Sequence, residues 1–229
     1  MTALLAQTDQ PLILWSWIGD HLDEVASRGL EHLWITLWAM TIGILIAFPV
    51  SVYAYRHHRV LPPVTLFAGV LYTIPSLALI TLLVPTTGLS YVTVVIPLIG
   101  YTLLILIRNF VAGFNGVPAD VKEAAIGMGY SKSQLLWRIE VPLAMPVIIA
   151  GIRIATVSTI GLVTIAALIG RGGFGQFILE GLNEFFWTPL LLGVVLSVAL
   201  ALIADLLLLG IQRLATPWAR AAGLRGVAT

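Results

Sequence analysis

The chain has 229 residues, of which 59% are hydrophobic and 10% are charged, and its mean hydropathy is +1.01. A soluble globular domain is about one-quarter charged, so this composition excludes one and predicts a polytopic membrane protein. Cysteine is absent, which excludes a disulfide framework and a thiolate metal site, and the four histidines lack a metal-ligand spacing. We therefore expect one all-α transmembrane domain over residues 1–229, with no bound metal.

Six segments are expected to form helices in or on the membrane. Residues 11–27 place apolar side chains opposite acidic ones, which is typical of a helix lying at the interface, with Trp15 and Trp17 at headgroup depth. Five apolar runs follow, and the first is roughly 34 Å long, enough to cross a hydrocarbon core of about 30 Å. The predicted transmembrane helices cover residues 33–55, 60–84, 90–107, 146–169 and 189–211.

Two runs carry candidates for the transport path and its gate. Pro75 falls in the middle of the second run, where a missing N–H should kink or open the helix. Thr156 and Thr164 lie eight residues apart in the fourth run and would share one helix face. That face could line a path, and it could equally serve close packing between helices.

Arg153 and Asp205 are the charges inside the fourth and fifth runs. Their expected depths are roughly 9 and 12 Å, and their signs are opposite, which favours a buried charge pair. The alternative is that Arg153 extends towards the aqueous boundary while Asp205 bonds hydroxyl groups or a partner subunit.

Residues 118–142 are too charged to lie in lipid and predict a helix, a turn and a second helix outside the membrane. Asp120 with Glu123, and Ser131 with Gln134, have the spacing of capping boxes. Gly129 fits the left-handed position that ends a helix.

The basic residues predict the orientation of the chain. With the amino terminus outside, nine basic residues lie in cytoplasmic segments against two outside, Arg28 and Arg171. The carboxyl terminus and the charged hairpin then lie in the cytoplasm. The nine are Arg56, Arg59, Arg108, Lys122, Lys132, Arg138, Arg213, Arg220 and Arg225.

The spacing within residues 118–142 resembles the EAA loop of ABC importer permeases, with Val141 where that pattern has leucine. The resemblance implies a coupling helix that docks on a cytoplasmic ATPase subunit, which would itself hold ATP and Mg²⁺. It implies neither a cofactor nor catalytic residues in this chain. The matching positions are Glu123, Ala124, Ala125, Gly129, Ile139 and Pro142.

Two further stretches narrow the resemblance. Residues 72–79, YTIPSLAL, and residues 160–175 resemble segments of osmoprotectant permeases. That family implies import of glycine betaine, choline, carnitine or proline betaine across a bacterial inner membrane. It also implies an ATPase dimer, an extracytoplasmic binding protein and a second permease subunit, identical or homologous. In that family the binding protein supplies the aromatic cage for the ligand, and Phe174, Phe185, Phe186 and Trp187 suit an interfacial belt or docking surface.

Other functions remain open at this stage. A methionine-type permease shares the EAA loop and would carry an amino acid. A secondary transporter would need buried ionisable relays or repeated spans, for which only Arg153 and Asp205 offer themselves. An intramembrane enzyme would need a nucleophile with a base, or a metal set, within the predicted spans, and they contain no Cys, His or Glu.

Overall fold

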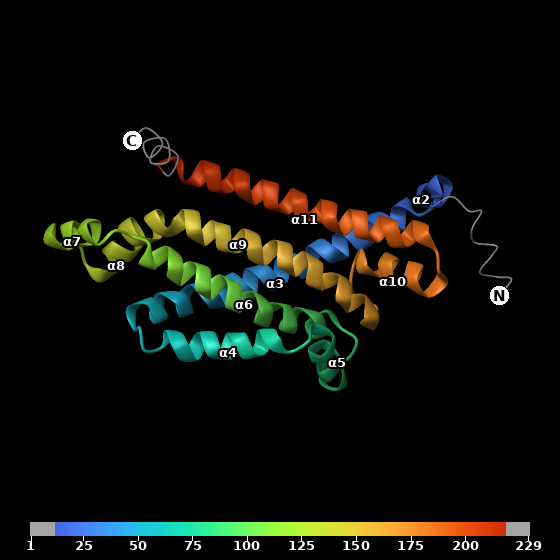
Figure 1. The fold of residues 1–229 in the computed structure, drawn as a ribbon, viewed down its shortest axis with the longest axis horizontal. Helices are drawn as coiled ribbons and strands as arrows, with labels where there is room; N and C mark the ends of the chain where they lie inside the picture. The colour runs from blue at the N-terminus through green and yellow to red at the C-terminus, as the bar shows by residue number, and fades with distance from the viewer. Residues whose placement is uncertain (1–11, 219–229) are drawn as a thin grey trace.

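The computed structural model describes residues 12–218, and within them it contains helices and no strands (Figure 1). This confirms the all-α class for the described part of the chain. The elements are α2 Trp15–Asp20, α3 Leu22–Arg56, α4 Leu61–Thr73, α5 Ser76–Thr87, α6 Tyr91–Asn115, α7 Ala119–Gly127, α8 Lys132–Leu135, the π-helix η1 Leu136–Glu140, α9 Val141–Val163, the 3₁₀-helix η2 Thr164–Ile169, α10 Gly175–Glu184 and α11 Trp187–Ala215.

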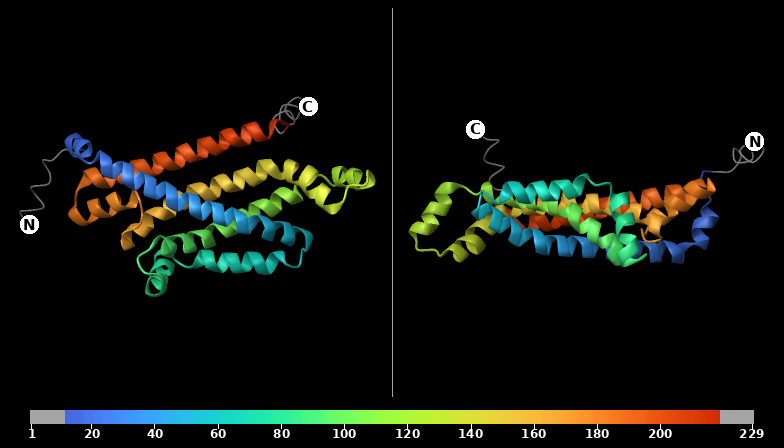
Figure 2. Two further views of the ribbon diagram at one scale, coloured as in Figure 1. Left: turned by 180° about the vertical axis from the view of Figure 1, so that it is seen from behind. Right: turned by 90° about the horizontal axis from the view of Figure 1, so that it is seen from below.

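The long helices run along one another and leave the α7–α8 hairpin projecting beyond one end (Figures 1 and 2). We call this the hairpin end, and the end with α2 and α10 the far end. α6 packs between α3 and α9, and α11 packs on α9 and α10. Four helices are long and apolar enough to cross a membrane, as are α4 and α5 if that bent pair forms one span. The described helices thus supply the five spans only when α4 and α5 are counted together.

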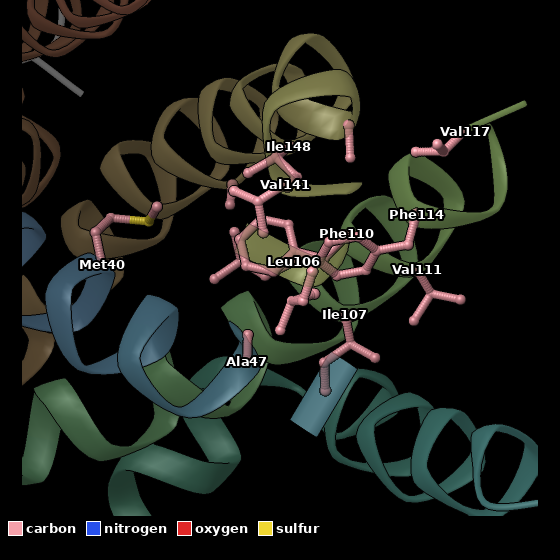
Figure 3. Packing of buried hydrophobic residues seen from close by; sticks show 13 residues of the cluster. Met40, Ala47, Leu106, Ile107, Phe110, Val111, Phe114, Val117, Val141 and Ile148 are labelled. Carbon is pink, nitrogen blue, oxygen red and sulfur yellow. The ribbon is translucent and has the colours of Figure 1, made fainter. Parts of the chain in front are cut away.

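The main hydrophobic core lies where α3, α6 and α9 meet, towards the hairpin end (Figure 3). Phe110 and Phe114 of α6 are fully buried and pack edge-on against Phe48 of α3. Ala144 and Ile148 of α9 close the other side. Burying aromatic rings between three helices fixes the position of the segment from which the hairpin emerges.

The first spanning helix is longer than predicted, and the interfacial helix is shorter. α2 covers only Trp15–Asp20, Pro11 lies outside the described residues, and α3 runs unbroken from Leu22 to Arg56 instead of from residue 33. At 1.5 Å per residue, α3 is roughly 52 Å long and exceeds a hydrocarbon core. Glu24 and Arg28 form an i,i+4 ion pair at 2.8 Å, so the charges that suggested a break support the helix.

The second predicted span is two helices. α4 ends at Thr73 and α5 begins at Ser76, with an 88° bend between them. Ile74 adopts the extended conformation (ψ 127°) that a following proline imposes. Its carbonyl accepts a 2.8 Å hydrogen bond from the Tyr101 hydroxyl, which satisfies an acceptor freed by the break. The interruption predicted at Pro75 is present, and it is larger than a kink.

The remaining spans also extend past their predicted bounds. α6 continues to Asn115 rather than residue 107, and α11 covers Trp187–Ala215. Pro142 does not stop a helix, because it lies in the first turn of α9, where its missing N–H costs nothing. The π-turn η1 therefore joins the hairpin directly to α9, and the fourth span begins at Val141 rather than residue 146. η2 tightens residues 164–169 into a 3₁₀ turn.

Candidate functional site

The α7–α8 hairpin is built by its turn residues. Gly129 has φ +84°, which confirms the left-handed position predicted after α7. Ser131 and Gln134 exchange both hydrogen bonds of a capping box at the start of α8, as predicted. The capping box predicted for Asp120 and Glu123 is wrong, because α7 begins at Ala119, with Pro118 as its N-cap and no side-chain cap. Asp120 instead lies in the first turn, where its charge stabilises the helix dipole.

The six motif residues do not form one continuous surface. Glu123, Ala124 and Gly129 are exposed, whereas Ala125 is 1% exposed and packs inward. Ala125 is therefore packed inside the protein, whereas Ala124 is open to a partner. Ile139 in η1 and Pro142 in α9 are half-buried at the junction with the spanning helix.

Large apolar side chains surround the exposed motif residues. Ile126 is 58% exposed, Met128 69% and Trp137 57%. Apolar groups on a hairpin this charged need a protein surface to cover them, since the helix lies outside the bundle (Figure 2). The hairpin thus presents an apolar face with small residues beside it, which suits insertion into a groove of another protein.

A buried carboxylate fastens the hairpin to α3. Glu140 is only 4% exposed, and its Oε1 accepts a 2.8 Å hydrogen bond from the Tyr55 hydroxyl. Lys122 Nζ donates to the same hydroxyl at 3.4 Å, and Arg56 Nη2 donates to the Lys132 carbonyl at 3.0 Å. These bonds connect α3 with α7, α8 and η1. The hairpin is therefore bonded directly to the end of a spanning helix.

An open cleft of about 610 Å³ separates the hairpin from the end of α3. Basic side chains dominate its lining, with Glu140 as the one acid. The basic residues are Arg56, His57, His58, Lys122 and Lys132.

Sequence reasoning missed Glu140 by grouping it with the solvated charges of the hairpin. The signal is its spacing: Leu136, Glu140 and Ala144 follow one another at four-residue intervals, and all three are buried. A carboxylate on the apolar face of a helix needs a donor, which the sequence alone does not identify as Tyr55.

The structure brings Arg153 and Asp205 together. Arg153 Nε and Nη2 donate to the two Asp205 carboxylate oxygens, each at 2.8 Å. Arg153 Nη1 also donates to Gln212 Oε1 at 3.2 Å. The pair bridges α9 and α11 and is not fully buried as expected, because its side chains are 23% and 30% exposed.

The gate and path candidates occupy different environments. Pro75 lies exposed at the α4–α5 break. Thr156 is 9% exposed and donates to the Ile152 carbonyl of its own helix, which fits packing better than a path surface. Thr164 is half-buried, follows α9 with helical dihedral angles, and donates to the Gly161 carbonyl at 2.7 Å. A path lined by both threonines stays a prediction.

The glycine-rich loop at residues 170–175 is a close-packed turn. A side chain at Gly173 would meet His32 and the Arg28 carbonyl of α3. Within residues 12–218 no group of three His, Asp or Glu side chains could hold a metal.

Comparison with known proteins agrees with this geometry. Residues 39–216 match the family described as binding-protein-dependent transport system inner membrane component. The chain is 36% identical over 197 residues to the glycine betaine/carnitine/choline transport system permease protein OpuCB of Bacillus subtilis, covering 86% of this chain and 89% of that protein. It is also 36% identical over 203 residues to the osmoprotectant import permease protein OsmW of Salmonella typhimurium, covering 86% and 94%.

The fold is shared with solved importers at lower sequence identity. A structure of the MetNI methionine ABC transporter in an inward-facing conformation matches with a TM-score of 0.75 and 20% identity, over 86% of this chain and 98% of that one. An amino acid ABC transporter crystallised with histidines matches with a TM-score of 0.71 and 16% identity. The chain belongs to the family of inner membrane components of binding-protein-dependent transport systems.

Proposed function

We propose that this chain is the permease subunit of an ATP-driven importer for compatible solutes of the glycine betaine, choline, carnitine and proline betaine type. The observation that carries the proposal is the similarity to permeases of such solutes over 86% of the chain. The methionine transporter shares the fold at 20% identity, so methionine serves as the competing substrate in the test.

The coupling partner proposed for the hairpin is a cytoplasmic ATPase subunit, which would hold ATP and Mg²⁺. Support comes from the exposed apolar face around Ile126 and Met128, and from the Tyr55–Glu140 bond that links the hairpin to α3. A second permease subunit and an extracytoplasmic binding protein would complete the importer, as the family description implies.

The orientation proposed has the hairpin end in the cytoplasm and the far end outside. Arg56, Lys122, Lys132 and Arg138 lie at the hairpin end, and a positive bias marks the cytoplasmic side. Arg220 and Arg225, which the sequence argument also counts, lie outside the described residues. Cysteines introduced one at a time at Met128 and Phe185, probed with an impermeant thiol reagent in intact cells, test this orientation. Labelling of the first without permeabilisation contradicts it.

The break at Pro75 is the proposed gate element. The Tyr101 hydroxyl donates to the Ile74 carbonyl within the 88° bend, so this hydrogen bond is placed to affect the angle between α4 and α5. Tyr101→Phe should alter the transport rate and leave the yield of assembled complex unchanged. Equal transport rates for Tyr101→Phe and the wild type would contradict a gating role for the break.

The function is tested with the reconstituted importer in proteoliposomes. Uptake and ATP hydrolysis should be stimulated by glycine betaine, choline or carnitine delivered by the cognate binding protein, and not by methionine. Stimulation by methionine alone would replace the proposed substrate class with an amino acid.

A further inference from the structure

A hollow of about 250 Å³ lies at the far end, between α3 and the start of α6. Three aromatic rings and one carboxylate take part in its lining. We call it the aromatic hollow. Its lining residues are Glu31, Trp34, Ile35, Trp38, Tyr91 and Val95.

The aromatic rings of the hollow are not packed away. Trp34 and Trp38 lie one turn apart on α3 with their rings stacked at 6.2 Å, and they are 60% and 54% exposed. Tyr91, the first residue of α6, is 46% exposed. The faces of Trp34 and Trp38 that do not stack on each other, which carry partial negative charge, are therefore open to a cation, whereas Arg171 lies over the Tyr91 ring.

The Glu31 carboxylate beside these rings is held in place by hydrogen bonds and has no cationic partner among the described residues. Glu31 Oε2 accepts from the Gly173 N–H at 3.2 Å and from Gln176 Nε2 at 3.0 Å. Oε1 has no hydrogen-bond partner among residues 12–218, and no described cation forms an ion pair with Glu31. A fixed negative charge next to open aromatic rings favours a quaternary ammonium group.

A second cleft, of about 260 Å³, adjoins the hollow and shares Glu31 and Tyr91 with it. Arg171 lies there with its Cζ 4.5 Å from the centroid of the Tyr91 ring, and its Nη1 donates to the Tyr91 hydroxyl at 3.2 Å. In the described part of the chain Arg171 has no acidic partner, whereas the neighbouring Arg28 is paired with Glu24. Its guanidinium is thus available to a carboxylate.

We propose that these two clefts form one site for a zwitterionic solute, with the quaternary ammonium group in the aromatic hollow and the carboxylate at Arg171. The site would receive the solute at the far end before transport. The inference rests on the proposed function, since the solute class comes from there, and it adds a preference for solutes that carry a carboxylate. The aromatic hollow, at about 250 Å³, lies below the usual volume range for drug-sized ligands, which suits a small headgroup.

The competing explanation is an interfacial belt, because Trp and Tyr gather at membrane boundaries without binding a ligand. Trp187 provides a matched control, since it is 56% exposed and begins α11 at the same end of the bundle. An effect of belt anchoring would appear equally at Trp187 and at the hollow.

The test uses the complete complex of permease and ATPase, without binding protein, in nanodiscs of phosphatidylethanolamine and phosphatidylglycerol. These lipids carry no choline headgroup. Radiolabelled glycine betaine is the first probe and tetramethylammonium the second. Trp34→Leu combined with Trp38→Leu should weaken binding of both about tenfold, as expected for lost cation–π contacts. The corresponding Phe pair should retain most of the affinity, and Trp187→Leu all of it.

A variant at Arg171 tests the carboxylate half of the site independently of the ammonium half. Arg171→Gln should weaken glycine betaine binding about tenfold and leave tetramethylammonium binding unchanged, because only the former has a carboxylate. An equal effect on both probes overturns the assignment of Arg171. Absence of glycine betaine binding to the wild-type complex at millimolar concentration, or an equal loss in Trp187→Leu, overturns the site. Displacement of tetramethylammonium by added phosphatidylcholine, without binding of free glycine betaine, would assign the hollow to a lipid headgroup.

The same variants, reconstituted in proteoliposomes, distinguish this inference from the proposed function. After reconstitution with binding protein, a wild-type complex that neither imports these solutes nor increases ATP hydrolysis contradicts the proposed function. A complex that imports them while the Trp34/Trp38 and Arg171 variants bind and transport like wild type contradicts the site alone.

Discussion

The hydroxyl of Tyr55 lies 2.8 Å from the Glu140 carboxylate and joins the last turn of α3 to the π-turn that carries the hairpin. Glu140 is the most deeply buried acidic side chain in the described part of the chain. When a buried acceptor loses its hydrogen-bond donor, the unfavourable free energy of its desolvation is no longer offset. The Tyr55–Glu140 hydrogen bond therefore stabilises the hairpin in its position against α3.

Tyr55→Phe should loosen the hairpin without unfolding the bundle. Loss of the donor is expected to cost about 1–3 kcal/mol locally, visible as faster amide exchange in α7 and α8. Solute-stimulated ATP hydrolysis should fall while ATPase co-purification persists. Tyr53→Phe is the matched control, because Tyr53 is 56% exposed on the same helix. Equal exchange rates in the two variants would show that the bond does not hold the hairpin.

Gly129 tests the turn itself. A Cβ at Gly129 would meet nothing within 4 Å, so Gly129→Ala acts only through the left-handed backbone and should cost about 1–2 kcal/mol. Gly127 also has open space but is helical, so Gly127→Ala should be neutral or stabilising by about 0.5–1 kcal/mol. We expect uncoupled ATP hydrolysis in the first variant and normal coupling in the second. Normal solute uptake by both variants, and by Gly129→Trp, would show that the turn is not part of the docking surface.

The chain order of the helices and the position of the hairpin follow from local signals. Apolar runs, the charged insert at residues 118–142 and the turn at Gly129 are each visible within about twenty residues of sequence. The Arg153–Asp205 contact also follows, because two opposite charges at similar depth have few other partners.

Features that depend on contacts between distant segments do not follow from the sequence. The hydrogen bond from Tyr101 at the 88° bend and the hydrogen bond from Tyr55 to the buried Glu140 each join residues that lie far apart in the sequence. The aromatic hollow joins α3 to α6, and the adjoining cleft adds the loop at Arg171, so three segments meet that no local pattern connects.

Glu180 of α10 should make the stability of the far end depend on pH. Burial, followed by the charges of Glu24 and Glu184, raises the pKa of Glu180, against the opposing effect of Arg28 and His21. A raised pKa means that the folded state holds its proton more tightly than the unfolded state. The stabilisation is thus complete below the ordinary glutamate range, about pH 4, and is lost as pH rises through the raised value. The melting temperature of detergent-solubilised protein should therefore fall as the pH rises above about 4.

Glu180→Gln should reduce that decrease, because the side chain no longer titrates. Glu123→Gln, on the hairpin at the opposite end, serves as the control and should retain the wild-type profile. Identical pH profiles for Glu180→Gln and the wild type would contradict the assignment to Glu180.

The Arg153–Asp205 pair gives the last prediction. A lone charge within a spanning helix is unfavourable, whereas the bidentate pair neutralises both groups. Asp205→Ala should therefore lower the yield of assembled complex, and Arg153→Ala combined with Asp205→Ala should restore part of it. Arg153→Lys should fall short of wild type, since an ammonium cannot form both bonds and also reach Gln212. Yield by size-exclusion chromatography and the melting temperature measure the effect in all variants. Losses that simply add in the double variant would show that the two charges act independently, despite their 2.8 Å contact.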